Sequence, residues 1–416
     1  MKRHFSFLIL LLFAAQAHAQ PTIHYVIPGG TGNGTSWQDG GDLAQMLTQA
    51  QDNDEVWVMQ GFYTLSPVVI YNSISVYGGF TGSETDPNMR PPLLMSRSVV
   101  DLSLNQGTVP SISVNFYPAV YPNNPNINFY FFPIINHFVM DGFILYGANT
   151  SRNWGGALRV DSVIDVHLRN LYIYNCRAID GGGMYLNKIR HGYMENVFFN
   201  NNFAENYGGG LFLSFCTDFT MVNTAFTNNY AECIYSPTQS CTYDTYGSGG
   251  VFIESSNVVV HNMTATNNGT DTTNDIAKRH SYKAGCITGS NVAFYNSIIY
   301  PDTMNIEYNA QKTVYYDRCC LWSTQSLGGK WYDSYSDTCY PNPTSTVIPT
   351  NVFSANPLFD FGTYYPFPYL QPNSPCIDAG SYSCGTQYDL FGNFRVTGID
   401  ADLGAMEYQQ DTSKNR

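Results

Sequence analysis

The sequence predicts an all-β protein that folds as a parallel β-helix, a solenoid in which successive coils of the chain stack on one another. One observation behind this prediction is a phrase of apolar residues around an asparagine, which returns along the chain. Its asparagines are Asn170, Asn196, Asn223, Asn262 and Asn296. A second observation is a glycine block that recurs with the phrase, at residues 155–156, 181–183, 208–210 and 249–250. A fixed period of this size is typical of solenoid proteins.

The spacing of the phrase predicts the shape of one coil. The first two steps are 26 and 27 residues, and the later steps of 39 and 34 residues leave room for insertions. Runs such as residues 197–199 and 258–260 are β-branched and aromatic, which favours strands. At about 3.3 Å per residue, a coil of this length suits three short strands joined by tight bends. Asparagine and glycine tolerate the positive φ of such bends, so we expect the five asparagines to hold turns and to stack into a hydrogen-bonded ladder.

Both ends of a solenoid need cover, because an open strand edge recruits other chains. Residues 42–50 are the best helix candidate, with Asp42 as N-cap and with Leu43, Met46 and Leu47 on one face. This short helix is predicted to cap the N-terminal end. The phrase is lost from about residue 351, so we expect residues 20–350 to form the β-helix and residues 351–410 to cover its other end.

Residues 1–19 have the pattern of a secretory signal peptide. Lys2 and Arg3 precede an apolar run at residues 7–15, and Ala17 and Ala19 frame a small-residue cleavage site. The mature chain should then begin at Gln20. No later segment has the roughly eighteen apolar residues that a transmembrane helix needs. We therefore predict a protein without a transmembrane segment, exported to the cell surface, the outer membrane or the extracellular space.

The composition restricts the partners. The chain carries 32 Asp and Glu against 19 Lys and Arg, a net charge of −13. This charge argues against nucleic acid, anionic membranes and acidic polysaccharide as bulk electrostatic partners. Aromatic residues reach 15% of the chain, which is a β-prone composition with many amphipathic rings.

Ten cysteines follow the signal, an even number, which in an exported protein indicates disulfides. Metal binding is the weaker alternative, because the sequence has no CxxC pair and no histidine cluster at zinc spacing. The candidate pairs are Cys233 with Cys241, Cys376 with Cys384, and Cys339 with Cys319 or Cys320.

Catalysis is the main alternative to binding. A polysaccharide lyase needs a base and a group that stabilises an oxyanion. The densest basic group is Lys188, Arg190 and His191, with Arg159 and Arg177 one coil away. Lys188 could act as a base beside Arg190, but we favour a solvated turn. A glycosidase needs two carboxylates roughly 5 to 9.5 Å apart, and no pair here repeats a glycosidase motif.

Calcium is the one cofactor that the sequence leaves open. Asp389, Asp400 and Asp402 offer the oxygen ligands that calcium prefers. We favour the alternative that Arg395 pairs with one of these carboxylates and locks the C-terminal region. No other cofactor is expected.

Rings gather in two insertions, residues 116–132 and 233–246. Long loops on a rigid scaffold commonly carry function, and rings on a flat face can stack on sugars. The alternative is that the rings only pad the wall of the solenoid. The candidate ligand-binding residues are Tyr117, Tyr121, Tyr130, Tyr235 and Tyr243.

Three groups of motifs resemble known families. The N-terminal motifs at residues 25–26, 34–37, 54–58, 61–63 and 75–85 resemble exported right-handed parallel β-helix repeat proteins of Bacteroidetes type. The Gly-Gly-Ala phrase at residues 155–157 and the Phe-x-x-Asn phrases that begin at Phe198 and Phe226 are similar to polymorphic outer-membrane protein repeats. The motifs at residues 374–380, 389–395 and 400–408 look like a choice-of-anchor Q domain. The resemblance implies a right-handed, pectin-lyase-like β-helix and export to the cell surface or beyond.

These observations lead to three hypotheses for function. The first is a non-catalytic, adhesin-like protein that binds glycan or matrix at an envelope or host surface. The second is a polysaccharide lyase or glycoside hydrolase. The third is a structural component of the envelope.

Overall fold

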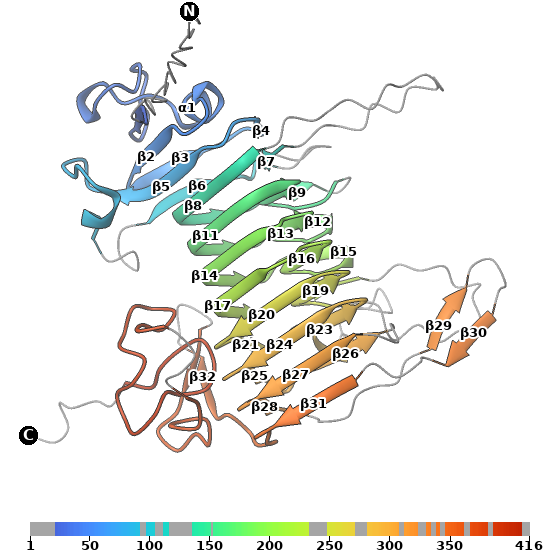
Figure 1. Cartoon of the computed structure of the whole chain (residues 1–416). Helices are drawn as coiled ribbons and strands as arrows, with labels where there is room; N and C mark the ends of the chain where they lie inside the picture. The colour runs from blue at the N-terminus through green and yellow to red at the C-terminus, as the bar shows by residue number, and fades with distance from the viewer. Residues whose placement is uncertain are drawn as a thin grey trace, which may run out of the picture.

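The computed structural model describes most of the chain after the predicted signal. The described ranges are residues 21–91, 97–104, 111–115, 135–150, 153–232, 248–270, 281–307, 312–322, 330–333, 338–341, 346–361, 367–381 and 386–409. Within them the chain forms a right-handed parallel β-helix, which confirms the predicted fold class (Figure 1).

The longest sheet runs through the whole stack, and each strand pairs in parallel with the strand one coil away. Its main path is β1 (Ile23–Val26), β2 (Glu55–Met59), β5 (Ser75–Phe80), β8 (Ile135–Tyr146), β11 (Val163–Tyr174), β14 (His191–Asn200), β17 (Phe219–Thr227), β20 (Asn257–His261), β24 (Asn291–Tyr295), β27 (Thr313–Asp317) and β31 (Thr346–Thr350). Beside this path lie β3 (Gly61–Thr64), β6 (Ser98–Asp101), β21 (Thr264–Thr266), β25 (Ile298–Ile299) and β28 (Cys320–Leu321).

A second sheet supplies the other faces of the solenoid. One face holds β4 (Val68–Ile70), β7 (Ile112–Val114), β10 (Leu158–Asp161), β13 (Met184–Asn187), β16 (Leu211–Ser214), β19 (Val251–Glu254), β23 (Ser281–Thr288) and β26 (Thr303–Glu307). The other holds β9 (Asn149–Thr150), β12 (Arg177–Asp180), β15 (Phe203–Tyr207), β18 (Tyr230–Ala231) and β22 (Gly269–Thr270). The described antiparallel strand pairs are β22 with β23, β29 (Lys330–Asp333) with β30 (Thr338–Pro341), and β32 (Phe359–Phe361) with β33 (Pro368–Leu370).

Four of the five predicted asparagines form a hydrogen-bonded ladder, and all five hold turns. All five asparagines have φ between 49° and 56°. Asn196 donates to the Oδ1 of Asn170 at 3.1 Å, Asn223 to Asn196 at 3.0 Å, and Asn262 to Asn223 at 3.2 Å. The last member differs, because Asn296 donates to the carbonyl oxygen of Ser381.

The ladder positions continue beyond the five asparagines. Gly142 occupies the equivalent bend in β8 with φ +89°, so Asn170 donates instead to the carboxylate of Asp141 at 2.7 Å. Arg318 and Asn351 hold the bends after β27 and β31, both with positive φ. The coil register therefore extends through Asn351, where the sequence indicates that the phrase is lost.

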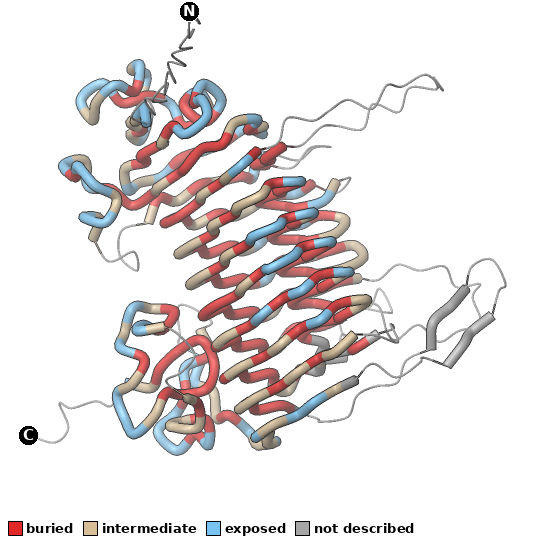
Figure 2. The backbone as a smooth tube through the Cα atoms, in the orientation of Figure 1, coloured by how far each residue is buried: buried red, intermediate tan, exposed pale blue. Residues whose placement is uncertain are grey.

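The interior is a stack of apolar side chains contributed coil by coil. In the long sheet, Leu168, Met194 and Met221 occupy equivalent positions and are fully buried. Phe199 and Phe226 stack with their ring centroids 4.9 Å apart. Buried stretches accordingly recur in every coil (Figure 2).

A second ladder lies inside the core and was not predicted. Asn202 donates to Asn229, Asn229 to Asn268, and Asn268 to Asp302, each over 2.8–2.9 Å. These four side chains are at most 1% exposed. Their bonds satisfy polar groups that the interior would otherwise leave unpaired.

The N-terminal cap is also confirmed. Helix α1 (Leu43–Gln49) begins after Asp42, whose carboxylate accepts the backbone N–H of Gln45 at 3.0 Å. Leu43, Met46 and Leu47 are buried, and the helix packs against β1, β2 and β4. The structure also has two 3-10 helices, η1 (Trp37–Asp39) and η2 (Pro87–Met89). Each likewise begins after a residue whose side chain accepts a backbone N–H group.

The C-terminal region lies along the flank of the stack, rather than only at its end as expected (Figure 1). Ser381, Thr386 and Tyr388 meet successive ladder asparagines in reverse order along the stack. The carbonyl oxygen of Ser381 accepts from Asn296, the hydroxyl of Thr386 from Asn262, and the carbonyl oxygen of Tyr388 from Asn223. Phe367 packs beside Tyr172 and Phe198, from β11 and β14. The region thus covers coils from β11 to β28.

Candidate functional site

Alternation along the long sheet points every second side chain outward. In register, these side chains form columns that cross the coils. One column contains His167, Tyr193, Thr220, Val259, Ala293 and Tyr315. The next column contains Asp141, Arg169, Glu195, Val222, His261, Tyr295 and Asp317. Any site on this face therefore draws one residue from each of several coils.

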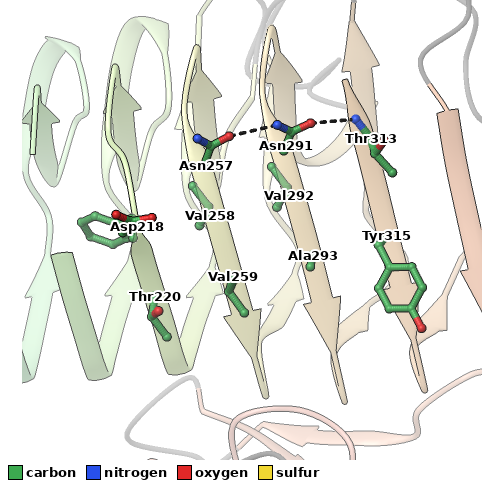
Figure 3. Close-up of a pocket in the computed structure, with 11 residues that line it drawn as sticks. Asp218, Thr220, Asn257, Val258, Val259, Asn291, Val292, Ala293, Thr313 and Tyr315 are labelled. Atoms are coloured by element: carbon green, nitrogen blue, oxygen red, sulfur yellow. Dashed lines mark hydrogen bonds between the residues drawn. The ribbon is translucent and has the colours of Figure 1, made fainter. Parts of the chain in front are cut away.

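A groove of about 690 Å³ crosses β17, β20, β24 and β27 on this face. Its floor is low because Thr220, Val259 and Ala293 are small compared with Tyr193 and Tyr315 in the same column. Figure 3 shows Val259 and Ala293 in a row, with Tyr315 closing one end. The result is a shallow trough that crosses the coils.

Amides form one side of this groove. Asn291 donates to the Oδ1 of Asn257 at 3.0 Å, and the backbone N–H of Thr313 donates to the Oδ1 of Asn291 at 3.0 Å (Figure 3). Both asparagines are exposed. These bonds orient the amides, and an oriented amide can donate to or accept from a hydroxyl group.

Rings lie in the next outward column, and one of them contacts Tyr315 of the groove. His261 and Tyr295 stack with centroids 5.0 Å apart, and Tyr295 contacts Tyr315 at 5.6 Å. Burial lowers the pKa of His261, so its imidazole is neutral at physiological pH. Asp218 is the one charged side chain among the residues that line the groove. The groove can therefore present amides and rings to a ligand with little net charge.

A second hollow, which we call the arginine cleft, lies on earlier coils of the same face. It has a volume of about 360 Å³. Its arginines come from three segments: Arg90 after η2, Arg97 before β6 and Arg169 in β11. Leu390, Phe391 and Gly392 of the C-terminal region complete it.

Two of the arginines are held in place by their neighbours. Arg90 pairs with Asp141 at 2.9 Å, and both side chains are under 10% exposed. Arg169 approaches the Nδ1 of His167 at 2.8 Å and lies over the ring of Tyr193 at 5.6 Å. The buried Nε atoms of Arg97 and Arg169 have no hydrogen-bond partner within the described ranges. Guanidinium donors of this kind suit a carboxylate or another anionic group.

Glu195 lies beside this cleft in the same column as Arg169. Burial raises the pKa of Glu195, while the nearby Arg169 opposes the shift. Burial lowers the pKa of Arg97 to about 10, which leaves it charged at neutral pH. A carboxyl group that holds its proton more tightly than usual beside cations is a candidate acid or base.

The predicted basic group lies in an exposed turn between β13 and β14. Lys188 has φ 57°, and Lys188, Arg190 and His191 are exposed while Ile189 between them is buried. His191 approaches Asp218 at 3.6 Å. Arg159 and Arg177 lie on the other two faces, where Arg159 pairs with Asp161 and Arg177 with Glu205. The structure therefore does not bring these five residues together.

The carboxylates of the three candidate calcium ligands accept hydrogen bonds from backbone N–H groups. Asp389 accepts the N–H groups of Phe391, Asn393 and Glu407, and Asp402 accepts those of Asp378 and Tyr408. The side chain of Asp400 accepts the N–H of Ala401. Within the described ranges, no three His, Cys, Asp or Glu side chains are arranged to hold a metal ion.

Arg395 locks the C-terminal region through several partners, and its charge opposes the rise that burial causes in the pKa of Asp402, one of the expected aspartates. It donates to the carbonyl oxygens of Gly404 and Ala405, approaches Glu407 at 3.9 Å, and bonds the side chain of Asn223. Burial raises the pKa of Glu407 to about 8. The cation is therefore shared between the solenoid and the region that covers it.

The candidate ring residues Tyr117, Tyr121, Tyr130, Tyr235 and Tyr243 lie outside the described residues, as do Cys233, Cys241 and Cys384. The described cysteines Cys176, Cys216, Cys286, Cys319, Cys320 and Cys376 are buried free thiols. No helix within the described ranges is long and apolar enough to span a membrane.

The sequence analysis missed the groove and the arginine cleft. The groove has no motif, since it consists of ordinary Thr, Val, Ala and Asn residues at equivalent positions of different coils. Counting back from the ladder asparagines would have aligned Val259 with Ala293 and Asn257 with Asn291. The cleft could not be found in this way, because Arg90, Arg97 and Leu390 lie outside the repeats.

Comparisons with known proteins add little beyond the fold. No protein-family model and no curated protein matches the chain. One similar solved structure is described as the crystal structure of pectate lyase Pel9A, with 15% sequence identity and a TM-score of 0.41. The match covers 94% of this chain and 97% of the lyase chain. A likeness at this level supports no conclusion about activity.

Proposed function

We propose that this chain is an exported protein that binds a neutral glycan along the outer face of its long sheet. The observation that carries the proposal is the groove, in which small side chains form a floor beside oriented amides, with the ring of Tyr315 at one end. Sugar rings present an apolar face to aromatic side chains and hydroxyls to amides. The groove also crosses successive coils, so it can follow a polymer.

The charge of the groove sets the class of glycan. Asp218 is the charged residue that lines it, and no lining residue is basic. An acidic polysaccharide would meet the carboxylate of Asp218 in the groove, while a neutral one meets only hydroxyl-compatible groups. Export is part of the proposal and is supported by the signal-like pattern of the first nineteen residues.

A printed array of neutral and acidic glycans tests the proposal, followed by calorimetry with the neutral oligosaccharide that binds best. Replacing Tyr315 or Asn291 by alanine should weaken binding about tenfold, which corresponds to about 1.4 kcal/mol. Phe62→Ala is the matched control, because Phe62 is 79% exposed and does not line the groove. Binding that survives both groove variants, or that is confined to acidic glycans, would contradict the proposal.

A second candidate function is cleavage of a polysaccharide at the arginine cleft. The observation in its favour is Glu195, whose pKa is raised by burial, in the same column as Arg169. In this mechanism Glu195 transfers a proton and Arg169 binds an anionic group of the substrate. Reducing-sugar and unsaturated-uronate assays test it, and activity should be lost in Glu195→Gln while binding in the groove persists.

A further inference from the structure

Cys320 and Cys376 are far apart in the sequence and meet where the C-terminal region packs on the last coils. Cys319 and Cys320 are adjacent, so alternation points their side chains to opposite sides of the strand. Cys319 points into the solenoid core, where its thiol donates to the carbonyl oxygens of Asp317 and Phe294. Cys320 points outward into an apolar cluster that also contains Leu370, Cys376 and Leu403.

Cys320 and Cys376 lie together in this buried cluster. The interaction between the two thiols raises the pKa of Cys376 and lowers the pKa of Cys320. The thiol of Cys320 in turn donates to the carbonyl oxygen of Ala355 at 3.2 Å. Both sulfurs are buried, at 0% exposure of each residue.

The backbone holds the two cysteines in place from both sides. The N–H of Cys320 donates to Ser297 at 2.9 Å, which fixes it to the neighbouring coil. The carbonyl oxygen of Cys376 accepts from the N–H of Leu403 at 2.9 Å, within the C-terminal region. Their contact is therefore a built feature of the interface between the coils and that region.

We propose that Cys320 and Cys376 form a disulfide that joins the last coils to the C-terminal region. The proposal rests on the export proposed above, because thiols stay reduced in the cytosol and are oxidised outside it. Each thiol loses its proton, and the two electrons reduce a disulfide oxidant such as oxidised glutathione to two thiols. A mixed disulfide forms on one cysteine, and the other cysteine displaces the glutathione thiol. Because both sulfurs are buried once the region has docked, the exchange takes place during folding.

Other described cysteines have different surroundings. Cys176 donates to the carbonyl oxygen of Tyr174 at 3.3 Å, and Cys216 to that of Ser214 at 3.4 Å. Both lie in the interior of the stack. The proposed pair also differs from the pairs that spacing suggests, which would join Cys376 to Cys384 and Cys320 to Cys339.

The test refolds the full mature chain in a buffer of reduced and oxidised glutathione and maps the cross-links by mass spectrometry after digestion with trypsin and chymotrypsin. We expect a fragment that joins Cys320 to Cys376. Cys319→Ser is the matched control and should keep this link, while Cys320→Ser should lose it. The link closes a loop of 55 intervening residues, so its reduction should lower the melting temperature by about 5 °C.

Two outcomes would overturn the disulfide: a link from Cys376 to Cys384, or alkylation of both Cys320 and Cys376 after refolding. Mapping of the wild-type chain decides the matter even if a serine variant does not fold. A separate arm isolates the chain from the envelope and medium of an expressing bacterium. A chain that is retained inside the cell, reduced, yet forms the link on refolding would overturn export and leave the disulfide standing.

Discussion

Asn223 is a ladder residue whose side chain makes hydrogen bonds to several partners. Its amide donates to Asn196 and to the carbonyl oxygen of Tyr388, and its oxygen accepts from Asn262 and Arg395. The side chain is 0% exposed and its φ is 49°. The sequence predicted the turn and the ladder, since both follow from the repeat. It could not predict the bonds to Tyr388 and Arg395, which join residues 165 and 172 positions apart.

Replacing Asn223 separates its two roles. Asn223→Gly keeps the positive φ but loses the hydrogen bonds, and it should cost about 2–3 kcal/mol because buried partners are left unpaired. Asn223→Ala adds backbone strain of about 1 kcal/mol. Urea denaturation measures both values. Equal stability of the two variants would show that the turn is not strained by alanine.

The buried carboxyl group of Asp302 leads to a prediction of how the free energy of unfolding depends on pH. Burial raises its pKa from 3.8 to about 7, and only its Oδ2 accepts bonds, both from Asn268. The folded state thus holds the proton more tightly than the unfolded state. The contribution of Asp302 to stability should be complete below about pH 4 and should be lost as pH rises through 7. Asp180, with a pKa of about 7, and Glu407 add to the same trend.

The variant Asp302→Asn tests this account, because the amide keeps an acceptor but cannot ionise. Between pH 4 and 8, the free energy of unfolding of the wild type should fall by about 3 kcal/mol more than that of the variant. Denaturant titrations at both pH values give the difference. Parallel pH profiles of the two proteins would mean that Asp302 does not titrate in this range.

Among single elements, helix α1 was the easiest to predict. Its N-cap and its apolar face are contained in nine consecutive residues, so no distant contact is needed to recognise them. The arginine cleft is the opposite case, since η2, β8, β11, β14 and residues 390–392 each contribute only one to three residues. Local patterns specify the cap, whereas tertiary contacts specify the cleft.

The cap residue Met46 should be sensitive to truncation. Its side chain is fully buried against the first coil, so Met46→Ala should cost about 2–5 kcal/mol. Ala44→Gly, at a partly exposed position of the same helix, should cost only about 1 kcal/mol. Thermal denaturation and light scattering measure the loss and any association through the uncovered end. A smaller loss for Met46→Ala would mean that the end of the core closes without it.

At the scale of the whole molecule, the repeat predicts the architecture but not the function. Coils recur about every 4.8 Å, so an outward column presents one side chain per coil at a spacing that the fold sets. Which residues occupy that column varies freely, since Thr220, Val259 and Ala293 pack into no core. The groove therefore depends on the least constrained positions of the repeat.

The length of the groove leads to a prediction for the binding of a polymer. The groove crosses four strands, which spans about 14 Å at the usual distance between neighbouring strands. Affinity for neutral oligosaccharides should rise with chain length until the groove is filled and then stay constant. Calorimetry with a length series of the bound sugar measures this. Affinity that is independent of length would place recognition at a chain end.

The described parts of the C-terminal region, residues 367–381 and 386–409, lie along the ladder and touch coils that are otherwise not neighbours. In a stack where each winding contacts only the ones above and below, disorder can begin at either end and travel inward. Here the windings from β11 to β28 are bound to the same C-terminal region, so loosening one of them requires the release of several. The N-terminal windings meet this region at the arginine cleft, where Leu390, Phe391 and Gly392 lie. With no bond from their ladder positions to the region among the described residues, they should open first, and the remainder should give way in a single cooperative step.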